Sequence, residues 1–177
     1  HYASQLLLAL GEKPLLLSTA GDFFDGKKIE LIRNAPSALE TIELHKTLRT
    51  FVNQGATHVC LEATSHALDQ DRLAGLDIDV AIFTNLTRDH IDYHGSMEKY
   101  LEAKKRLFDG LNSNALAVVN VDNEYGNQMT TDTQAKIVTY GTTAQIYNFD
   151  VLKVSSQGTD ISLSGQNITV PIIGLFN

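Results

Sequence analysis

Short, solidly apolar runs alternate with amphipathic stretches over the first 121 residues, and this alternation constrains the fold more than any other feature. The apolar runs lie at residues 13–19, 58–62, 79–84 and 115–121. Each has the length and composition of a strand buried on both faces. Helices are predicted at residues 1–10, 37–53, 65–72 and 96–108. Strands that alternate with helices predict an α/β fold, with a mainly parallel sheet and helices on both of its faces.

Turn and capping residues mark the ends of these elements. Asp25-Gly26 is a strong hairpin signal in the segment that follows the first apolar run. We expect Ser37 or Asn34 to cap the second helix. Ser96, with an acidic residue in the first turn and basic residues toward the end, is expected to cap the last helix.

The character of the chain changes after about residue 136. Residues 136–140, 145–156, 159–164 and 167–172 are short runs rich in β-forming side chains, separated by turn residues. We therefore predict a small antiparallel β extension over residues 136–177, attached to an α/β body over residues 1–135.

The composition limits the class of protein. With 177 residues the chain has the length of one globular domain, and a hydrophobic content of 43% excludes a disordered chain. A formal net charge of −7 argues against a nucleic-acid partner, because such a surface needs clustered positive charge. The single cysteine, Cys60, cannot form an internal disulfide and is expected to pack as a small hydrophobic side chain. No apolar run reaches the ~20 residues of a membrane span and no signal peptide opens the chain, so a cytoplasmic protein is expected.

Polar side chains follow three of the predicted strands, at the point where each strand ends. Glu62 ends one run, Asn85 follows the next, and Asn120 and Asp122 lie at the end of the last. Ligands of open parallel sheets bind beyond the carboxyl ends of the strands. A carboxylate near amide groups and imidazoles such as His90 suits a Mg²⁺ ion that also contacts a phosphate.

The same residues have plainer interpretations when each is taken alone. Glu62 could cap a neighbouring helix, and His66, His90 and His94 could pack in the core or lie at the surface. Lys104 could be an ordinary lysine on a solvated helix.

Several motifs of nucleotide binding and catalysis are absent from the sequence. It contains no G-x-x-x-x-G-K-[ST] phosphate loop and no G-x-G-x-x-G dinucleotide fingerprint. It also lacks the G-x-S-x-G nucleophile elbow and the H-E-x-x-H zinc motif. The sequence therefore does not support a Rossmann dinucleotide site. Nucleophilic catalysis through Cys60 is not expected either, because this residue lies inside the apolar run of a strand.

Three ordered blocks carry a resemblance to a known family. They are EATSHALDQDR at residues 62–72, FTNLTRDHIDYHG at residues 83–95 and YLEAKKRLF at residues 100–108. These blocks closely resemble the central, ATP-binding domain of the Mur ligases. The resemblance is strongest to the MurE branch, which adds the third amino acid of the peptidoglycan stem to UDP-N-acetylmuramoyl-dipeptide, and it extends over nearly all of the chain.

This resemblance implies an ATP-dependent acid–amino-acid ligase and a domain fold like that of P-loop NTPases. The family activates a substrate carboxylate with ATP, and the acyl phosphate that results is attacked by an incoming amine to give an amide. Glu62, His90 and Lys104 match the positions that hold Mg²⁺, Lys104 as a carbamate formed with carbon dioxide. They are the catalytic and metal-binding residues that the resemblance predicts.

The remaining matched positions are predicted to bind the two substrates. Asn85 resembles the asparagine near the ATP phosphates, and Asn120 and Asp122 resemble the segment near the nucleotide base and ribose. The residues predicted to hold the UDP-muramoyl dipeptide are Asn34, Thr64, Ser65, Gln70 and Arg72.

The resemblance also predicts which parts of a Mur ligase this chain lacks. The family has a Gly-Thr-Asn-Gly-Lys-Thr phosphate loop just before the helix predicted at residues 1–10, and a C-terminal domain that would begin after Asn177. We expect the chain to be the central domain of a larger bacterial ligase, inactive alone. Asn34-Ala35-Pro36 stands where MurE enzymes usually carry Thr-Thr-Pro, so a related ligase with another acceptor is the first alternative.

A second alternative belongs to another class: a degenerate ligase domain kept for binding or assembly. The missing phosphate loop favours it, whereas the intact Glu62, His90 and Lys104 argue against it. The sequence does not predict which amino acid is added or the oligomeric state.

Overall fold

The computed structural model describes residues 1–31, 39–163 and 165–171. The chain divides into two compact units, His1–Leu76 and Asp77–Asn177, and each is described here by itself. The predicted boundary between a body and an extension at residue 136 stays a prediction.

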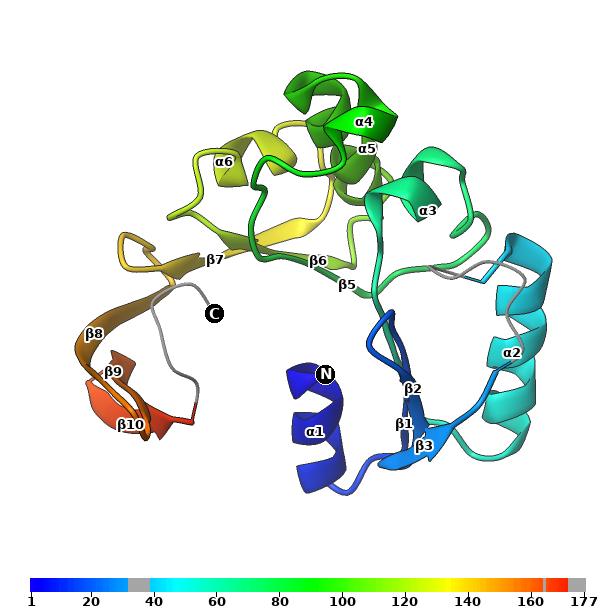
Figure 1. The fold of residues 1–177 in the computed structure, drawn as a ribbon, viewed down its shortest axis with the longest axis horizontal. Helices are drawn as coiled ribbons and strands as arrows, with labels where there is room; N and C mark the ends of the chain where they lie inside the picture. Colours follow the sequence, from blue (N-terminus) through cyan, green and yellow to red (C-terminus); the bar gives the residue numbers. More distant parts are fainter. Residues whose placement is uncertain (32–38, 164, 172–177) are drawn as a thin grey trace. The chain divides into compact units, whose positions relative to one another are not determined.

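The first unit is a small sheet with helices on both faces (Figure 1). Its four strands have the order β3-β2-β1-β4. β1 and β4 are parallel, with Leu15 opposite Val59, and β1, β2 and β3 pair antiparallel. The elements are α1 (Tyr2–Ala9), β1 (Pro14–Leu17), β2 (Asp22–Phe24), β3 (Lys27–Ile29), α2 (Thr41–Asn53), β4 (His58–Leu61) and α3 (Ser65–Asp69).

The core of the first unit lies between β1 and α2. Leu15 and Leu17 pack with Leu44 and Phe51 of the helix, and all four side chains are buried. α1 covers the opposite face of the sheet (Figure 1). Burial of β1 on both faces confirms the strand predicted at residues 13–19.

Local signals in the first unit gave one correct and one wrong prediction. Asp25 and Gly26 have positive φ angles of 49° and 74° and join β2 to β3, so the predicted hairpin is confirmed. The predicted cap of α2 is wrong, because the N-cap is Glu40, whose side chain makes no capping hydrogen bond. Asn34 and Ser37, the residues proposed for that role, lie outside the described residues.

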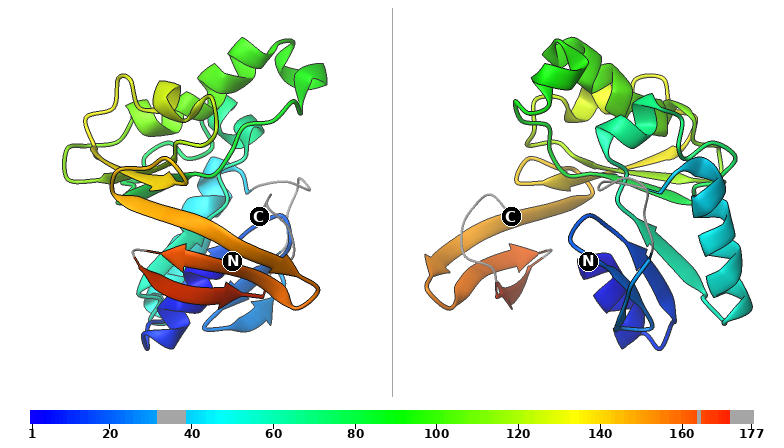
Figure 2. Two further views of the ribbon diagram at one scale, coloured as in Figure 1. Left: turned by 90° about the vertical axis from the view of Figure 1, so that its left-hand side faces the viewer. Right: turned by 45° about the vertical axis from the view of Figure 1, so that its right-hand side comes forward.

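The second unit is a six-stranded sheet with the order β10-β9-β8-β7-β6-β5. Neighbouring strands from β5 to β8 pair in parallel: β5 with β6, β6 with β7, and β7 with β8. The pairs β8–β9 and β9–β10 are antiparallel. Figure 2 shows β8 extending beyond the parallel strands and carrying β9 and β10. The α/β fold class with an antiparallel β extension is therefore confirmed. The elements are β5 (Val80–Phe83), α4 (Ile91–His94), α5 (Met97–Asp109), β6 (Leu116–Asn120), α6 (Gly126–Met129), β7 (Lys136–Gly141), β8 (Tyr147–Ser155), β9 (Gly158–Leu163) and β10 (Gln166–Val170).

The helices of the second unit lie on one face of its parallel strands (Figure 1). Ala81 and Phe83 of β5 are buried against that face, in a cluster that includes Phe108 of α5. Val80 and Ile82 point the other way and are 48% and 53% exposed. The apolar composition of this strand predicted that both of its faces are buried. Within the part of the chain that the structure describes, that prediction is wrong.

The N-terminus of α5 forms as predicted. The Ser96 hydroxyl accepts a hydrogen bond from the Lys99 backbone N–H at 3.3 Å. Among the described residues, no helix is both long and apolar enough to cross a membrane.

Candidate functional site

Glu62, a predicted metal ligand, lies where the parallel strands of the first unit end. Thr19 follows β1 and Glu62 follows β4. The backbone N–H of Thr19 donates to Glu62 Oε2 at 2.7 Å, and the Thr19 hydroxyl lies 2.9 Å and 3.1 Å from the two carboxylate oxygens. The interaction holds an exposed carboxylate in a defined orientation at the carboxyl edge of the sheet.

The predicted substrate-binding residues of this unit surround the short helix α3. The Thr64 hydroxyl caps α3 by accepting from the Ala67 N–H at 3.2 Å. Ser65 is buried, whereas Gln70 is exposed. Arg72 forms an ion pair with Glu40 at 3.1 Å. Asn34, the fifth predicted substrate-binding residue, lies outside the described residues.

In the second unit, Asn85 and Asn120 lie at adjacent strand ends. Asn85 is exposed and follows β5 after Thr84. Asn120 is the last residue of β6, and its Nδ2 donates to the Thr84 carbonyl oxygen at 2.8 Å. The parallel register therefore brings these two predicted ATP-binding residues to one edge of the sheet.

His90 and Lys104 meet at the ring of Tyr100. The His90 ring lies edge-on to Tyr100 with centroids 5.9 Å apart, and Lys104 Nζ lies 5.6 Å from the Tyr100 centroid. The His94 ring stacks on Tyr100 at 5.2 Å. Burial raises the pKa of the Tyr100 hydroxyl, and the charge of Asp89 raises it further. A buried aromatic ring thus brings together two residues that the sequence placed in one metal site.

The backbone at His90 is unusual for a residue with a side chain. Its φ of 54° and ψ of 24° lie in the left-handed region, and it is the N-cap residue that precedes α4. The Asp89 carboxylate accepts from the His90 backbone N–H at 2.7 Å and lies 3.6 Å from its ring Nδ1. Backbone strain at a residue predicted to bind a ligand is typical of functional positions.

The Asp122 carboxylate is engaged by the loop that follows β7. It accepts hydrogen bonds from the backbone N–H and the hydroxyl of both Thr142 and Thr143, at 2.7–3.2 Å. Burial alone would raise the pKa of this carboxyl, but the four hydrogen bonds outweigh it and hold the pKa below its usual value. Gly141 precedes the two threonines, and a Cβ there would lie 2.8 Å from Asp122 Cγ.

The chemistry of Glu62 fits a bound Mg²⁺ ion. Mg²⁺ is usually held by one or two carboxylates together with water and phosphate oxygens, and an ionised carboxylate has spare lone pairs besides those that face Thr19. The described residues contain no group of three or more histidine, cysteine, aspartate or glutamate side chains that could hold a metal by themselves.

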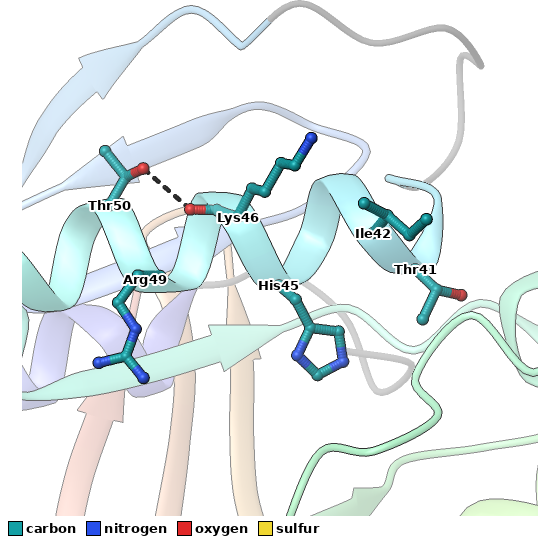
Figure 3. Close-up of a pocket in the computed structure, with 6 residues that line it drawn as sticks. All are labelled: Thr41, Ile42, His45, Lys46, Arg49 and Thr50. Carbon is teal, nitrogen blue, oxygen red and sulfur yellow. Dashed lines mark hydrogen bonds between the residues drawn. The ribbon is translucent and has the colours of Figure 1, made fainter.

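One open hollow in the described chain lies away from this chemistry. It runs along the outer side of α2 and is lined by Thr41, Ile42, His45, Lys46, Arg49 and Thr50 (Figure 3). No residue that the sequence predicts to be functional lines it. Among the six residues drawn in Figure 3, one hydrogen bond is marked, and it lies within the helix. The Thr50 hydroxyl donates it to the Lys46 carbonyl oxygen at 2.8 Å.

The sequence analysis did not single out several residues that shape the two strand edges. Thr19 holds Glu62, Tyr100 gathers His90 and Lys104, and the two threonines after Gly141 hold Asp122. Thr19 could have been found, because it follows an apolar run in the same way as Glu62. The sequence around Thr142 and Thr143 indicated only a turn between two β-rich runs.

Comparisons with known proteins identify the family of this chain. The family model described as the Mur ligase middle domain matches residues 2–177. The chain belongs to the Mur ligase middle-domain family. The UDP-N-acetylmuramoyl-L-alanyl-D-glutamate--2,6-diaminopimelate ligase of Parabacteroides distasonis is 37% identical over 174 residues, which are 98% of this chain and 35% of that protein.

Two solved structures are similar to this Mur ligase middle domain. A UDP-N-acetylmuramoyl-L-alanyl-D-glutamate--2,6-diaminopimelate ligase matches 97% of this chain and 36% of its own, with a TM-score of 0.80 and 34% identity. A bifunctional folylpolyglutamate synthase/dihydrofolate synthase with Mn, AMPPNP and L-glutamate bound matches 92% of this chain and 43% of its own, with a TM-score of 0.57 and 17% identity. At that identity the likeness shows a shared fold. The chain spans about a third of the length of the curated relatives that it matches.

Proposed function

We propose that this chain is the middle domain of an ATP-dependent ligase that adds the third amino acid to UDP-N-acetylmuramoyl-dipeptide in bacterial peptidoglycan synthesis. The observation that carries the proposal is 37% identity to a diaminopimelate-adding ligase over 98% of the chain. The proposal places the enzyme in the bacterial cytoplasm, where ATP is available.

The positions of the side chains support a site for ATP at the strand ends. Asn85, Asn120 and Asp122 lie at the carboxyl edge of the parallel strands of the second unit, where α/β folds bind nucleotides. Glu62 lies at the carboxyl edge of the first unit. Amide donors and one oriented carboxylate suit phosphate groups and the cation that accompanies them.

The proposed reaction forms an acyl phosphate and then an amide. The substrate carboxylate attacks the γ-phosphorus of ATP and ADP leaves; the amine then attacks the acyl carbon, releases phosphate and loses a proton. Such reactions depend on positioned charge rather than on a protein nucleophile. Burial raises the pKa of the Cys60 thiol and lowers its thiolate fraction, and the proposed reaction does not use this side chain.

We propose that Mg²⁺ is held by Glu62, His90 and Lys104, the last as a carbamate. When bound, the ion would neutralise charge on the phosphates. Glu62 is oriented by Thr19, and Tyr100 brings His90 and Lys104 together on one ring. Thr64, Ser65, Gln70 and Arg72 are proposed to bind the UDP-muramoyl dipeptide around α3.

The proposal is tested in the full-length ligase with ATP, Mg²⁺, the UDP-muramoyl dipeptide and 2,6-diaminopimelate, the amino acid in the names of the curated relatives. Formation of ADP and of a product heavier by one amino-acid residue is expected. Glu62→Gln should lower turnover at least about 100-fold by weakening metal binding. Glu12→Gln is the matched control, because Glu12 precedes β1 at the opposite edge of the sheet.

Three outcomes would contradict parts of this proposal. Turnover of Glu62→Gln close to that of the wild type would remove Glu62 from the metal site. A product with a different amino acid would support the related ligase with another acceptor. Absence of ADP formation with every acceptor would favour the non-catalytic module.

A further inference from the structure

Three side chains from the β6–β7 edge donate hydrogen bonds to the segment that leaves β5. We call residues 83–86 the exit segment, because they carry the chain out of β5 toward His90. The donors form what we call the carbonyl clamp, and they are Asn120, Asn123 and Tyr140.

Two clamp residues hold the start of the exit segment. Asn120 Nδ2 donates to the Thr84 carbonyl oxygen at 2.8 Å, and the Tyr140 hydroxyl donates to the Phe83 carbonyl oxygen at 3.2 Å. Asn120 and Tyr140 are register partners at the end of the β6–β7 ladder. Burial and the charge of Asp122 raise the pKa of the Tyr140 phenol, which keeps it protonated as a donor.

The third clamp residue holds the end of the segment. Asn123 Nδ2 donates to the Leu86 carbonyl oxygen at 3.3 Å, and the Leu86 side chain is 3% exposed within the core. Thr84 and Leu86 both lie beyond Phe83, the last residue of β5 that is in register with β6. Hydrogen bonds from side chains therefore replace the strand ladder on both sides of Asn85.

The two clamp asparagines use the same local turn. Asn120 Oδ1 accepts from the Asp122 N–H at 3.0 Å, and Asn123 Oδ1 accepts from the Tyr125 N–H at 3.1 Å. In each case the amide oxygen bonds to the backbone two residues later, which turns the amide NH₂ toward the exit segment. An aspartate could form the same turn but could not donate to the carbonyl oxygen.

We propose that Asn120, Asn123 and Tyr140 are positioning residues that fix the backbone on both sides of Asn85 and so set how Asn85 meets the ATP phosphates. The proposal rests on the proposed function. Asn85 is exposed while its neighbours are held, which is the arrangement that a preorganised polar contact requires. Asn120 then has this positioning role through the exit segment in addition to its proposed place in the ATP site.

The test uses the full-length ligase and substitutions that remove one donor each. Asn120→Asp and Asn123→Asp keep the local turn and lose the donated hydrogen bond, and Tyr140→Phe loses only the hydroxyl without a change in charge. Asn148→Asp is the control, because Asn148 donates an equivalent bond at 2.7 Å to the Thr142 carbonyl oxygen, outside the exit segment. The readouts are ATP affinity by calorimetry and hydrogen exchange of the peptide that covers residues 83–90.

Each clamp variant is expected to weaken ATP binding about tenfold, the change that follows from one lost hydrogen bond. Hydrogen exchange of the exit peptide should accelerate by a similar factor, and the Asn148→Asp control should leave this exchange unchanged. A variant that acts through Asn85 has no further effect once Asn85 is removed. Adding Asn123→Asp or Tyr140→Phe to Asn85→Ala should therefore cause no further loss of ATP affinity. A variant that acted by destabilising the whole protein would lower the affinity in both backgrounds.

Two results would overturn the clamp. One is equal loss of ATP affinity from Asn123→Asp in the wild-type and Asn85→Ala backgrounds. The other is unchanged exchange of the exit peptide in all three clamp variants. A wild-type protein that binds ATP and forms no amide would overturn the proposed function alone, because affinity and exchange would still report on the clamp.

Discussion

The four hydrogen bonds at Asp122 predict a specific order of stability among its variants. In Asp122→Asn, an amide oxygen in place of Oδ1 can still accept from the Thr142 hydroxyl and from both donors of Thr143. The bond lost is the shortest, from the Thr142 N–H to Oδ2 at 2.7 Å, and that N–H would then face an NH₂ group. Asp122→Ala loses all four bonds.

The size of each effect follows from charge and exposure. A hydrogen bond to a charged group contributes roughly 1.5–3 kcal/mol when water is excluded. Asp122 is exposed, so water replaces part of each lost bond and the values must be reduced. We expect the free energy of unfolding to fall by about 1 kcal/mol in Asp122→Asn and by about 2 kcal/mol in Asp122→Ala.

The pH dependence has a defined sign. The pKa of Asp122 is lower in the folded protein than in the unfolded chain, so its charge stabilises the fold above the unfolded pKa of about 3.9. This contribution is lost as the pH falls through the folded pKa. The difference between wild type and Asp122→Asn should therefore shrink between pH 7 and pH 3.

Urea unfolding of the three proteins, followed by circular dichroism at both pH values, measures these differences. Equal stability of wild type, Asp122→Asn and Asp122→Ala at pH 7 would refute the stabilising role of the four bonds. A wild-type advantage over Asp122→Asn that persists unchanged at pH 3 would refute the electrostatic part of the reasoning.

Three further predictions concern packing, backbone conformation and reactivity. Leu15→Ala should lower the free energy of unfolding by about 3 kcal/mol in urea titrations, because Leu15 is fully buried, whereas Leu10→Ala should change it little at 78% exposure. Gly141→Ala should cost about 2 kcal/mol, since its φ is 140° and the new Cβ would contact Asp122; unchanged stability would exclude that contact. Cys60 should react with iodoacetamide at pH 8 at least about tenfold more slowly in the native protein than in urea, because burial raises its pKa. Mass spectrometry follows this reaction, and equal rates would contradict that shift.

The pattern of the sequence predicted the strands better than their surroundings. Pro14–Leu17 is buried on both faces as its apolar run indicated, but Val80 and Ile82 of an equally apolar run are about half exposed. Composition reports how apolar a strand is. Which faces are covered depends on where helices from other parts of the chain pack.

By itself, the sequence determined the α/β class, the hairpin at Asp25-Gly26 and the family, because these depend on local periodicity, turn chemistry and ordered motifs. Only the tertiary structure decided what the polar side chains at the strand ends contact. Asn120 reaches Thr84 across 36 positions of sequence, and Asp122 reaches Thr142 across 20. Such partners are selected by the register of parallel strands that meet at one edge, and no local pattern of residues encodes that register.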